Sequence, residues 1–119
     1  MEIKEVVPFF AVNDMEKSVA FYVDGLGFEM TSKWEDEGVL RWCTFRKESA
    51  GVMLQMYPTE GHDARTFSDN KGEGVSMYFM CTDAVAYYKE PKERGVDASE
   101  PVVGNRQWVT DVHDPDGYH

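Results

Sequence analysis

Two similar short stretches, SVAFY at residues 18–22 and AVAYY at residues 84–88, decide the fold class of this chain. Each belongs to a segment that begins with an apolar run ending in an aspartate. A phenylalanine precedes that aspartate by four residues in both places, Phe10 before Asp14 and Phe79 before Asp83. Such a recurrence indicates an internal repeat. We therefore predict two copies of one supersecondary unit.

The first copy has the pattern of a strand, a helix and three further strands. Residues 5–12 are β-branched and aromatic, as expected of a strand. Asn13 and Glu16 then have the spacing of a helix capping box, and apolar residues recur at helical spacing until Gly25. The connections EDEG and KESAG have hairpin length. They join the next three predicted strands, at residues 28–34, 39–46 and 52–57.

The second copy repeats this order but stops after its third strand. Residues 74–81 are predicted to be a strand and residues 84–94 a helix, capped by Asp83, kinked or shortened by Pro91 and ended by Gly95. Residues 96–103 and 107–113 are the remaining predicted strands. The segment at residues 58–74, rich in Gly, Asp and Ser, is the predicted linker. We thus expect one α+β domain over residues 1–119, with module one at 1–57 and module two at 75–119.

The overall charge disfavours whole classes of partner. The chain carries 22 acidic against 12 basic side chains, a formal net charge of −10. A field of that sign repels nucleic-acid phosphates and anionic lipid surfaces. It favours cationic ligands, although an acidic surface also simply keeps a protein soluble. We predict no nucleic-acid and no membrane partner.

The two cysteines and the N-terminus indicate the compartment. Cys43 and Cys81 each lie inside an apolar run, whereas a disulfide framework uses more cysteines and places them in loops. Both are predicted to be reduced and buried. The N-terminal segment lacks the features of a signal peptide, and no apolar run is long enough to cross a membrane. We predict a cytoplasmic protein.

The order of these motifs resembles one known family. The repeated aspartate with SVAFY or AVAYY, the sequence GLGF at residues 25–28 and DPDGY at residues 114–118 are similar to those of the vicinal oxygen chelate superfamily. This superfamily comprises glyoxalases, bleomycin resistance proteins and extradiol dioxygenases. The resemblance covers nearly the whole chain. It implies two βαβββ modules that curl into half-barrels around a concave cleft, with the last strand of the second module absent from this chain.

The same resemblance assigns the DPDG sequence to a turn before that last strand. Proline presets one turn position and Gly117 supplies the positive φ that another requires. Tyr118 and His119 would then begin the final strand.

Catalytic members of the family hold a divalent metal, and the matching positions do not favour one in this chain. They correspond to Val7, Gln55 and Ser76, and to a position about two residues beyond His119. Valine and serine are poor ligands and a glutamine amide is a weak one. The histidines His62, His113 and His119 fall in the linker or around the terminal turn. We predict no metal, no cofactor and no catalytic residues.

What remains is a small-molecule cleft. Counted from Asp14 and Asp83, strand alternation turns Phe10, Val12, Met77, Phe79 and Cys81 toward the helices, and their neighbours toward the concave side. Apolar walls with a few polar tips are typical of a ligand pocket. An aromatic residue on a strand is also often simply core. The predicted ligand-binding residues are Phe9, Trp42, Met53, Gln55, Tyr57, Tyr78 and Trp108.

This combination resembles the metal-free bleomycin-resistance branch of the family. It implies a protein that sequesters a cationic aromatic compound in a groove between two subunits, and hence antibiotic resistance. Half-barrels with apolar faces need a partner, so we predict a homodimer. The alternatives are a metal-dependent glyoxalase-like lyase or ring-cleaving dioxygenase, and a pure interaction module.

Overall fold

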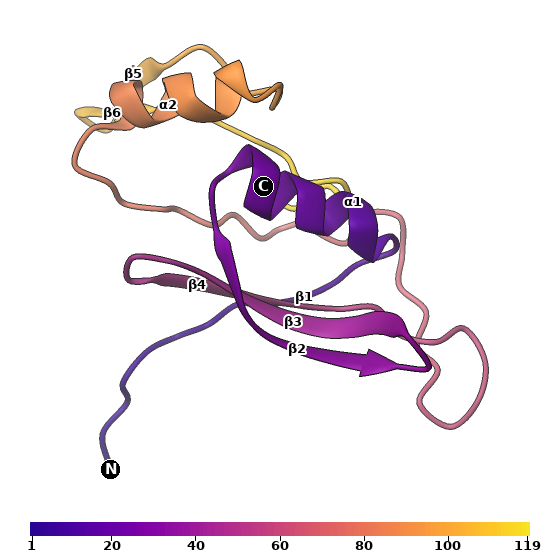
Figure 1. Cartoon of the computed structure of the whole chain (residues 1–119). Helices are drawn as coiled ribbons and strands as arrows, with labels where there is room; N and C mark the ends of the chain where they lie inside the picture. Colours follow the sequence, from indigo (N-terminus) through magenta and orange to yellow (C-terminus); the bar gives the residue numbers. More distant parts are fainter.

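The computed structural model describes all of residues 1–119. Residues 1–57 form a four-stranded sheet covered on one side by a helix (Figure 1). The strand order is β1-β4-β3-β2, with β1 parallel to β4 and the other neighbours antiparallel. We call residues 1–57 the first half. Its elements are β1 (Phe9–Ala11), α1 (Met15–Val19), η1 (Ala20–Gly25), β2 (Glu29–Asp36), β3 (Val39–Lys47) and β4 (Ala50–Gln55).

The helix of the first half begins one residue later than the capping-box spacing predicts. Its N-cap is Asp14, whose carboxylate accepts the Lys17 backbone N–H at 3.2 Å. The prediction that Asn13 and Glu16 form the box is wrong, because the Asn13 N–H donates to the distant carboxylate of Asp116 at 3.0 Å instead. After α1 the helix continues without a break into the π-helical turn η1. This helical segment ends at Gly25, as predicted.

The hydrophobic core lies between this helix and the sheet. Phe10 and Val12 face it, whereas the neighbouring Phe9 is 49% exposed on the other side, which confirms the predicted alternation along the first strand. Phe45 and Leu54 are fully buried. Each such side chain removes enough apolar area from water to contribute about 1.5–3 kcal/mol. This core therefore holds the sheet in place.

Residues 75–119, which we call the second half, form less regular structure. Asp83 caps the predicted helix by accepting the Ala86 N–H at 2.9 Å. The helix continues through Pro91, and Gly95 with φ +89° ends it. The elements are α2 (Ala84–Glu93), β5 (Val102–Gly104) and β6 (Gln107–Val109), with an isolated bridge between Ala98 and Val112.

The prediction of a strand at residues 74–81 is wrong. In the first half, β1 is held by parallel pairing with β4 alone. The second half has no counterpart of β4 among the 119 residues, so residues 75–81 are extended but join no ladder. The long predicted strands at 96–103 and 107–113 are reduced to β5, β6 and the bridge for the same reason, since a two-stranded ribbon is weak alone.

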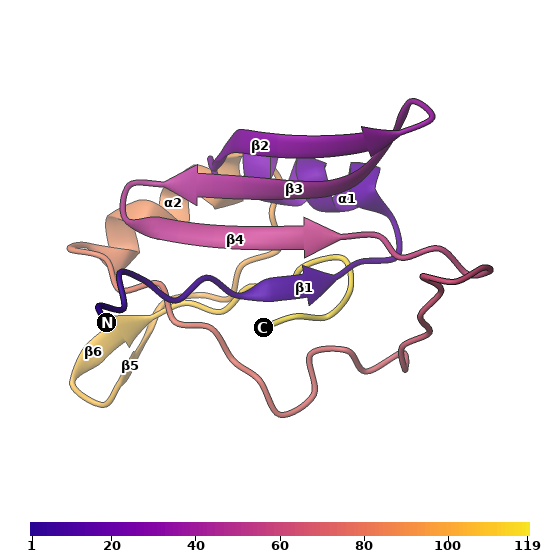
Figure 2. The same ribbon diagram turned by 90° about the horizontal axis from the view of Figure 1, so that it is seen from below.

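The DPDG turn joins the two halves. Gly117 has φ +88° and its N–H donates to the Asp114 carbonyl at 3.0 Å, which confirms the predicted turn. The next residue, Tyr118, stacks on Phe10 with ring centroids 4.1 Å apart and donates to the Ala11 carbonyl at 3.0 Å. The end of the chain thus lies beside β1 (Figure 2). No helix of the chain is long and apolar enough to cross a membrane.

Candidate functional site

The face of the sheet opposite α1 is open, and Figure 2 views the molecule from that side, with the helices behind. Strand register places five predicted ligand-binding residues there. One row across the sheet runs Phe9, Met53, Thr44, and the next runs Ala11, Gln55, Trp42, Trp34. Tyr57 follows Gln55 by two residues and continues on the same side. We call this surface the open face.

The open face is apolar, aromatic and partly exposed to solvent. Phe9 is 49% and Trp34 is 53% exposed, while Trp42, Met53 and Gln55 are half-buried by their neighbours. The orientation of Trp34 could not be decided from the sequence, and pairing with Trp42 settles it. Contiguous exposed apolar patches are typical of interaction and ligand-binding surfaces.

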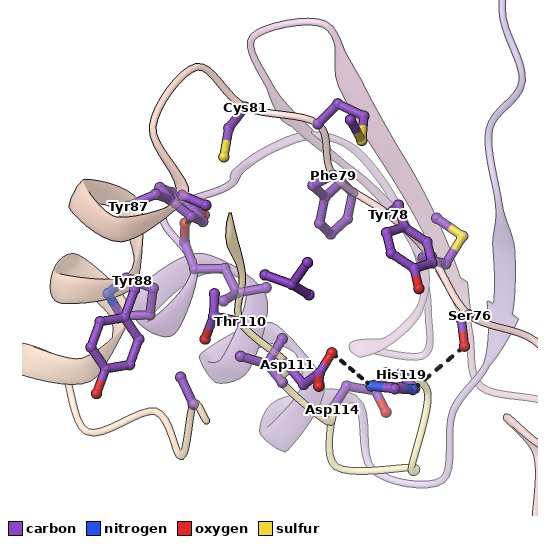
Figure 3. A pocket seen from close by; sticks show the side chains of 18 of the residues that line it. Ser76, Tyr78, Phe79, Cys81, Tyr87, Tyr88, Thr110, Asp111, Asp114 and His119 are labelled. Atoms are coloured by element: carbon purple, nitrogen blue, oxygen red, sulfur yellow. Dashed lines mark hydrogen bonds and ion pairs between the residues drawn. The ribbon is translucent and has the colours of Figure 1, made fainter. Parts of the chain in front are cut away.

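A pocket of about 380 Å³ lies on the other side of the sheet, between η1 and the second half. Figure 3 shows the rings of Tyr78, Phe79, Tyr87 and Tyr88 around it. The remaining predicted ligand-binding residues, Tyr78 and Trp108, line this pocket, and both are largely exposed. Phe10 also lines the pocket while Phe9 lies on the open face, so the sheet separates the predicted residues into two groups.

Polar groups gather at one end of this pocket around His119. Its Nε2 lies 3.2 Å from the Asp111 carboxylate and its Nδ1 lies 3.4 Å from the Ser76 hydroxyl, as Figure 3 shows. The His113 ring stacks on it with centroids 4.5 Å apart. Both histidines are exposed, as the sequence predicts. No group of three or more metal-ligating side chains occurs in the chain.

Asp114 is the buried polar centre between the halves. Its carboxylate accepts the Tyr22 hydroxyl at 2.8 Å and the backbone N–H groups of Asp116 and Tyr118, both at 2.9 Å. Burial raises the pKa of Asp114 above its ordinary value, although these hydrogen bonds act in the opposite direction. Burial, with the nearby Asp114 charge, also strongly raises the pKa of Tyr22. The DPDG sequence predicts only a turn at Asp114 and gives no sign of this contact with Tyr22.

The sequence model of the Glyoxalase/Bleomycin resistance protein/Dioxygenase superfamily matches residues 3–119. The chain belongs to this superfamily. No curated protein is significantly similar in sequence.

Several solved structures share the superfamily fold. TnmS3, an antibiotic-binding protein from Streptomyces sp. CB03234, is 23% identical with a TM-score of 0.70, covering 98% of this chain and 92% of that one. A bleomycin resistance determinant encoded on transposon Tn5 is 17% identical with a TM-score of 0.72, covering 97% and 92%. The bleomycin-binding protein of Streptomyces verticillus, solved with copper(II)-bleomycin, is 19% identical with a TM-score of 0.72, covering 98% and 92%. Identities this low show a common fold.

The positions at which catalytic superfamily members hold a metal do not fit one in this chain. Val7 offers no donor atom. Gln55 lies on the open face, whereas Ser76 lines the pocket and contacts His119. A divalent cation needs several imidazole, carboxylate or thiolate donors converging on one point. Val7, Gln55 and Ser76 include no imidazole, carboxylate or thiolate donor, and their side chains do not meet at one point.

The buried cysteine, Cys43, is a poor nucleophile. Cys43 is free and buried, as predicted, and burial raises the pKa of its thiol to about 11. A thiol with a raised pKa is a poor source of thiolate. Cys81 is free, but the prediction that it is buried is wrong, because residues 75–81 lack the pairing strand that would hold it inside.

Proposed function

We propose that this superfamily member binds a small aromatic cation on the open face, without a metal, and so sequesters it. The observation that carries the proposal is the uncovered row of Gln55, Trp42 and Trp34, which offers flat rings on a rigid sheet. Aromatic faces attract planar and cationic groups. The net charge of −10 adds a field that draws cations to the protein. Among the proteins of similar structure, one binds bleomycin and another binds an antibiotic, which suggests resistance by sequestration.

The proposal includes a homodimer. Phe9, Trp42, Met53, Gln55 and Tyr57 lie on one side of the sheet, while Tyr78 and Trp108 line the pocket on the other side. One ligand can touch both groups only if the second group comes from another subunit. A two-fold axis would place the second half of each subunit over the open face of its partner, completing two equivalent half-barrel clefts. The proposed location is the cytoplasm, where both cysteines stay reduced.

Assembly is the first test of the proposal. Light scattering at micromolar concentration should give about twice the 13.6 kDa mass of the chain. A Trp42→Glu variant places a charge in the proposed interface and should be monomeric. If the wild-type protein is monomeric at all concentrations, the proposal of a cleft shared by two subunits is wrong.

Ligand binding is the second test. Bleomycin and the planar cation ethidium, titrated separately, should quench tryptophan fluorescence in the wild-type protein. The response should be strongly reduced in Trp42→Leu and unchanged in Lys89→Gln, which lies on the exposed side of α2. Binding that survives Trp42→Leu would place the ligand elsewhere. Binding that requires added Zn²⁺, Ni²⁺, Mn²⁺ or Fe²⁺ would contradict the metal-free proposal.

A further inference from the structure

The linker between the halves contacts Tyr57, which lies two residues beyond the end of β4. It leaves the end of β4, projects beyond the sheet and turns back toward the second half (Figures 1 and 2). On this path the Arg65 guanidinium lies over the Tyr57 ring, 5.0 Å from its centroid. The Phe67 ring lies 5.5 Å from the same ring at 49°. We call these three residues the Tyr57 cluster.

Arg65 is one of nine basic side chains that form no ion pair within the chain. Acidic side chains outnumber basic ones by 22 to 12, yet the Arg65 side chain forms no ion pair and donates no hydrogen bond. Arg46, by contrast, donates to Glu5 through two nitrogens, at 2.7 and 2.5 Å. The aromatic face of Tyr57 is thus the only partner of the Arg65 cation within the chain. A cation within about 6 Å of a ring centroid is attracted by the ring quadrupole.

The chain offers a second cation over a tyrosine ring for comparison. Lys47 lies 5.2 Å from the centroid of Tyr87, whose hydroxyl donates to the Leu26 carbonyl at 2.6 Å. That ring is tied into the contact between the halves. The Tyr57 hydroxyl makes no hydrogen bond within the chain, and Phe67 is 47% exposed. The Tyr57 ring face that Arg65 covers would therefore be available to a different cation once Arg65 moves away.

The linker is anchored so that Arg65 can leave without loosening either end. Lys71 pairs with Asp116 at 3.5 Å, with side chains only 4% and 3% exposed. Gly72 packs so closely on the DPDG turn that a Cβ would lie 2.6 Å from the Gly117 carbonyl oxygen. Between Tyr57 and this anchor, residues 59–70 are exposed except Ala64. Their short-range bonds, such as Arg65 N–H to the Pro58 carbonyl at 3.2 Å, hold only the turn itself.

We propose that Tyr57 and Phe67 form a subsite for an organic cation, a quaternary ammonium or guanidinium group, which Arg65 occupies in the free protein. The cationic group of a ligand displaces Arg65, and the linker swings away while Lys71 and Gly72 stay in place. This rests on the proposed function, because Tyr57 follows Gln55 by two residues and so continues on the same side as the open face. Arg65 thereby acts as a built-in competitor that weakens the binding of cations.

The test uses the whole chain and two isosteric probes, choline and the neutral 3,3-dimethylbutan-1-ol, followed by NMR. Choline should shift the Arg65 Nε–H resonance toward its position in a Tyr57→Leu variant, and the alcohol should not. Arg65→Gln should bind choline about two- to fivefold more tightly, the change expected from removing one exposed cation–π competitor. Lys89→Gln makes the same change in net charge on α2 and should bind as the wild type does.

Equal affinities of wild type and Arg65→Gln would overturn the subsite, as would equal binding of the alcohol or no binding of choline. Ethidium or bleomycin binding that persists in those cases leaves the proposed function standing. If neither the wild type nor any variant binds ethidium or bleomycin, but choline still displaces Arg65, the proposed function is contradicted and the subsite stands.

Discussion

The two halves of the molecule begin with the same motif and reach different degrees of order. Asp14 and Asp83 both cap a helix through the backbone N–H three residues on. All ten residues of the buried core cluster, however, lie in the first half, between Phe10 and Leu54. The difference lies in the fourth strand: β4 pairs with both β1 and β3, while residues 75–81 have no such partner. A repeated motif therefore specifies its helix locally, but its sheet only through a distant strand.

The largest expected effect contrasts a buried ring of the first half with a partly exposed ring of the second half. Phe45→Ala removes a fully buried ring and should lower the free energy of unfolding by about 3–5 kcal/mol. Phe79→Ala removes a ring that is 40% exposed and contacts Phe28 at 5.6 Å, and should cost about 1 kcal/mol. Urea unfolding measures both. If the two substitutions lower the free energy of unfolding equally, the second half shares the core, and the predicted difference between the halves is wrong.

The next effect concerns the contact that joins the halves. Asp114→Ala leaves the Tyr22 hydroxyl and two backbone N–H groups without their acceptor, and should cost about 2–3 kcal/mol in urea unfolding. Asp114→Asn keeps an acceptor oxygen and should cost less. Asp111→Ala is the matched control, because Asp111 is exposed and pairs only at the surface. If Asp111→Ala lowers the free energy of unfolding as much as Asp114→Ala does, the contacts of Asp114 do not hold the two halves together.

Much of the fold followed from the sequence because its signals are local. Alternation along residues 5–12 correctly separated Phe10 from Phe9, and Asp83 and Gly95 marked the two ends of the second helix, whereas the capping box predicted at Asn13 and Glu16 was wrong. The hairpin turns between β2, β3 and β4 were equally clear, since two-residue connections leave little freedom. The failures, the strand at 74–81 and buried Cys81, both required a pairing partner that the local pattern does not reveal.

The site was less predictable because its contacts join distant residues. The partners of Asp114 and Asp116, Tyr22 and Asn13, lie about a hundred residues earlier in the chain, and the turn signal of DPDG hides this second use. Arg65 gave no signal at all, and Phe67 only that of an isolated aromatic in a polar linker. Which rings share the proposed cleft depends on how the proposed second subunit is placed, which the pattern of a single chain does not encode.

The pH dependence of stability sharpens the comparison through Asp114. Burial raises the pKa of Asp114 in the folded state, so the folded chain holds this proton more tightly than the unfolded chain does. The contribution of this proton to the stability of the fold is fully present below the ordinary pKa of 3.8. It is lost as the pH rises through the raised pKa of Asp114. The stability of the wild type relative to Asp114→Asn should therefore fall between pH 3 and neutrality. Subtracting the variant removes the opposite contribution of Glu5, whose pKa Arg46 lowers. A difference that rises with pH would contradict the raised pKa.

The smallest effect comes from two hairpin turns, one in each half, that share one geometry. Glu37 and Gly38 join β2 to β3 with φ +51° and +77°, and Asn105 and Arg106 join β5 to β6 with φ +48° and +64°. Both turns need positive φ at two positions, for which Asn-Gly is the preferred pair. Glu37→Asn and Arg106→Gly each create that pair and should favour their hairpin by about 0.5 kcal/mol.

In the first half the hairpin belongs to the core sheet, so Glu37→Asn should raise the urea midpoint. In the second half the ribbon has only two strands, so Arg106→Gly should slow amide hydrogen exchange in β5 and β6 while leaving the midpoint unchanged. A shift of the midpoint by Arg106→Gly would mean that both halves unfold as one unit.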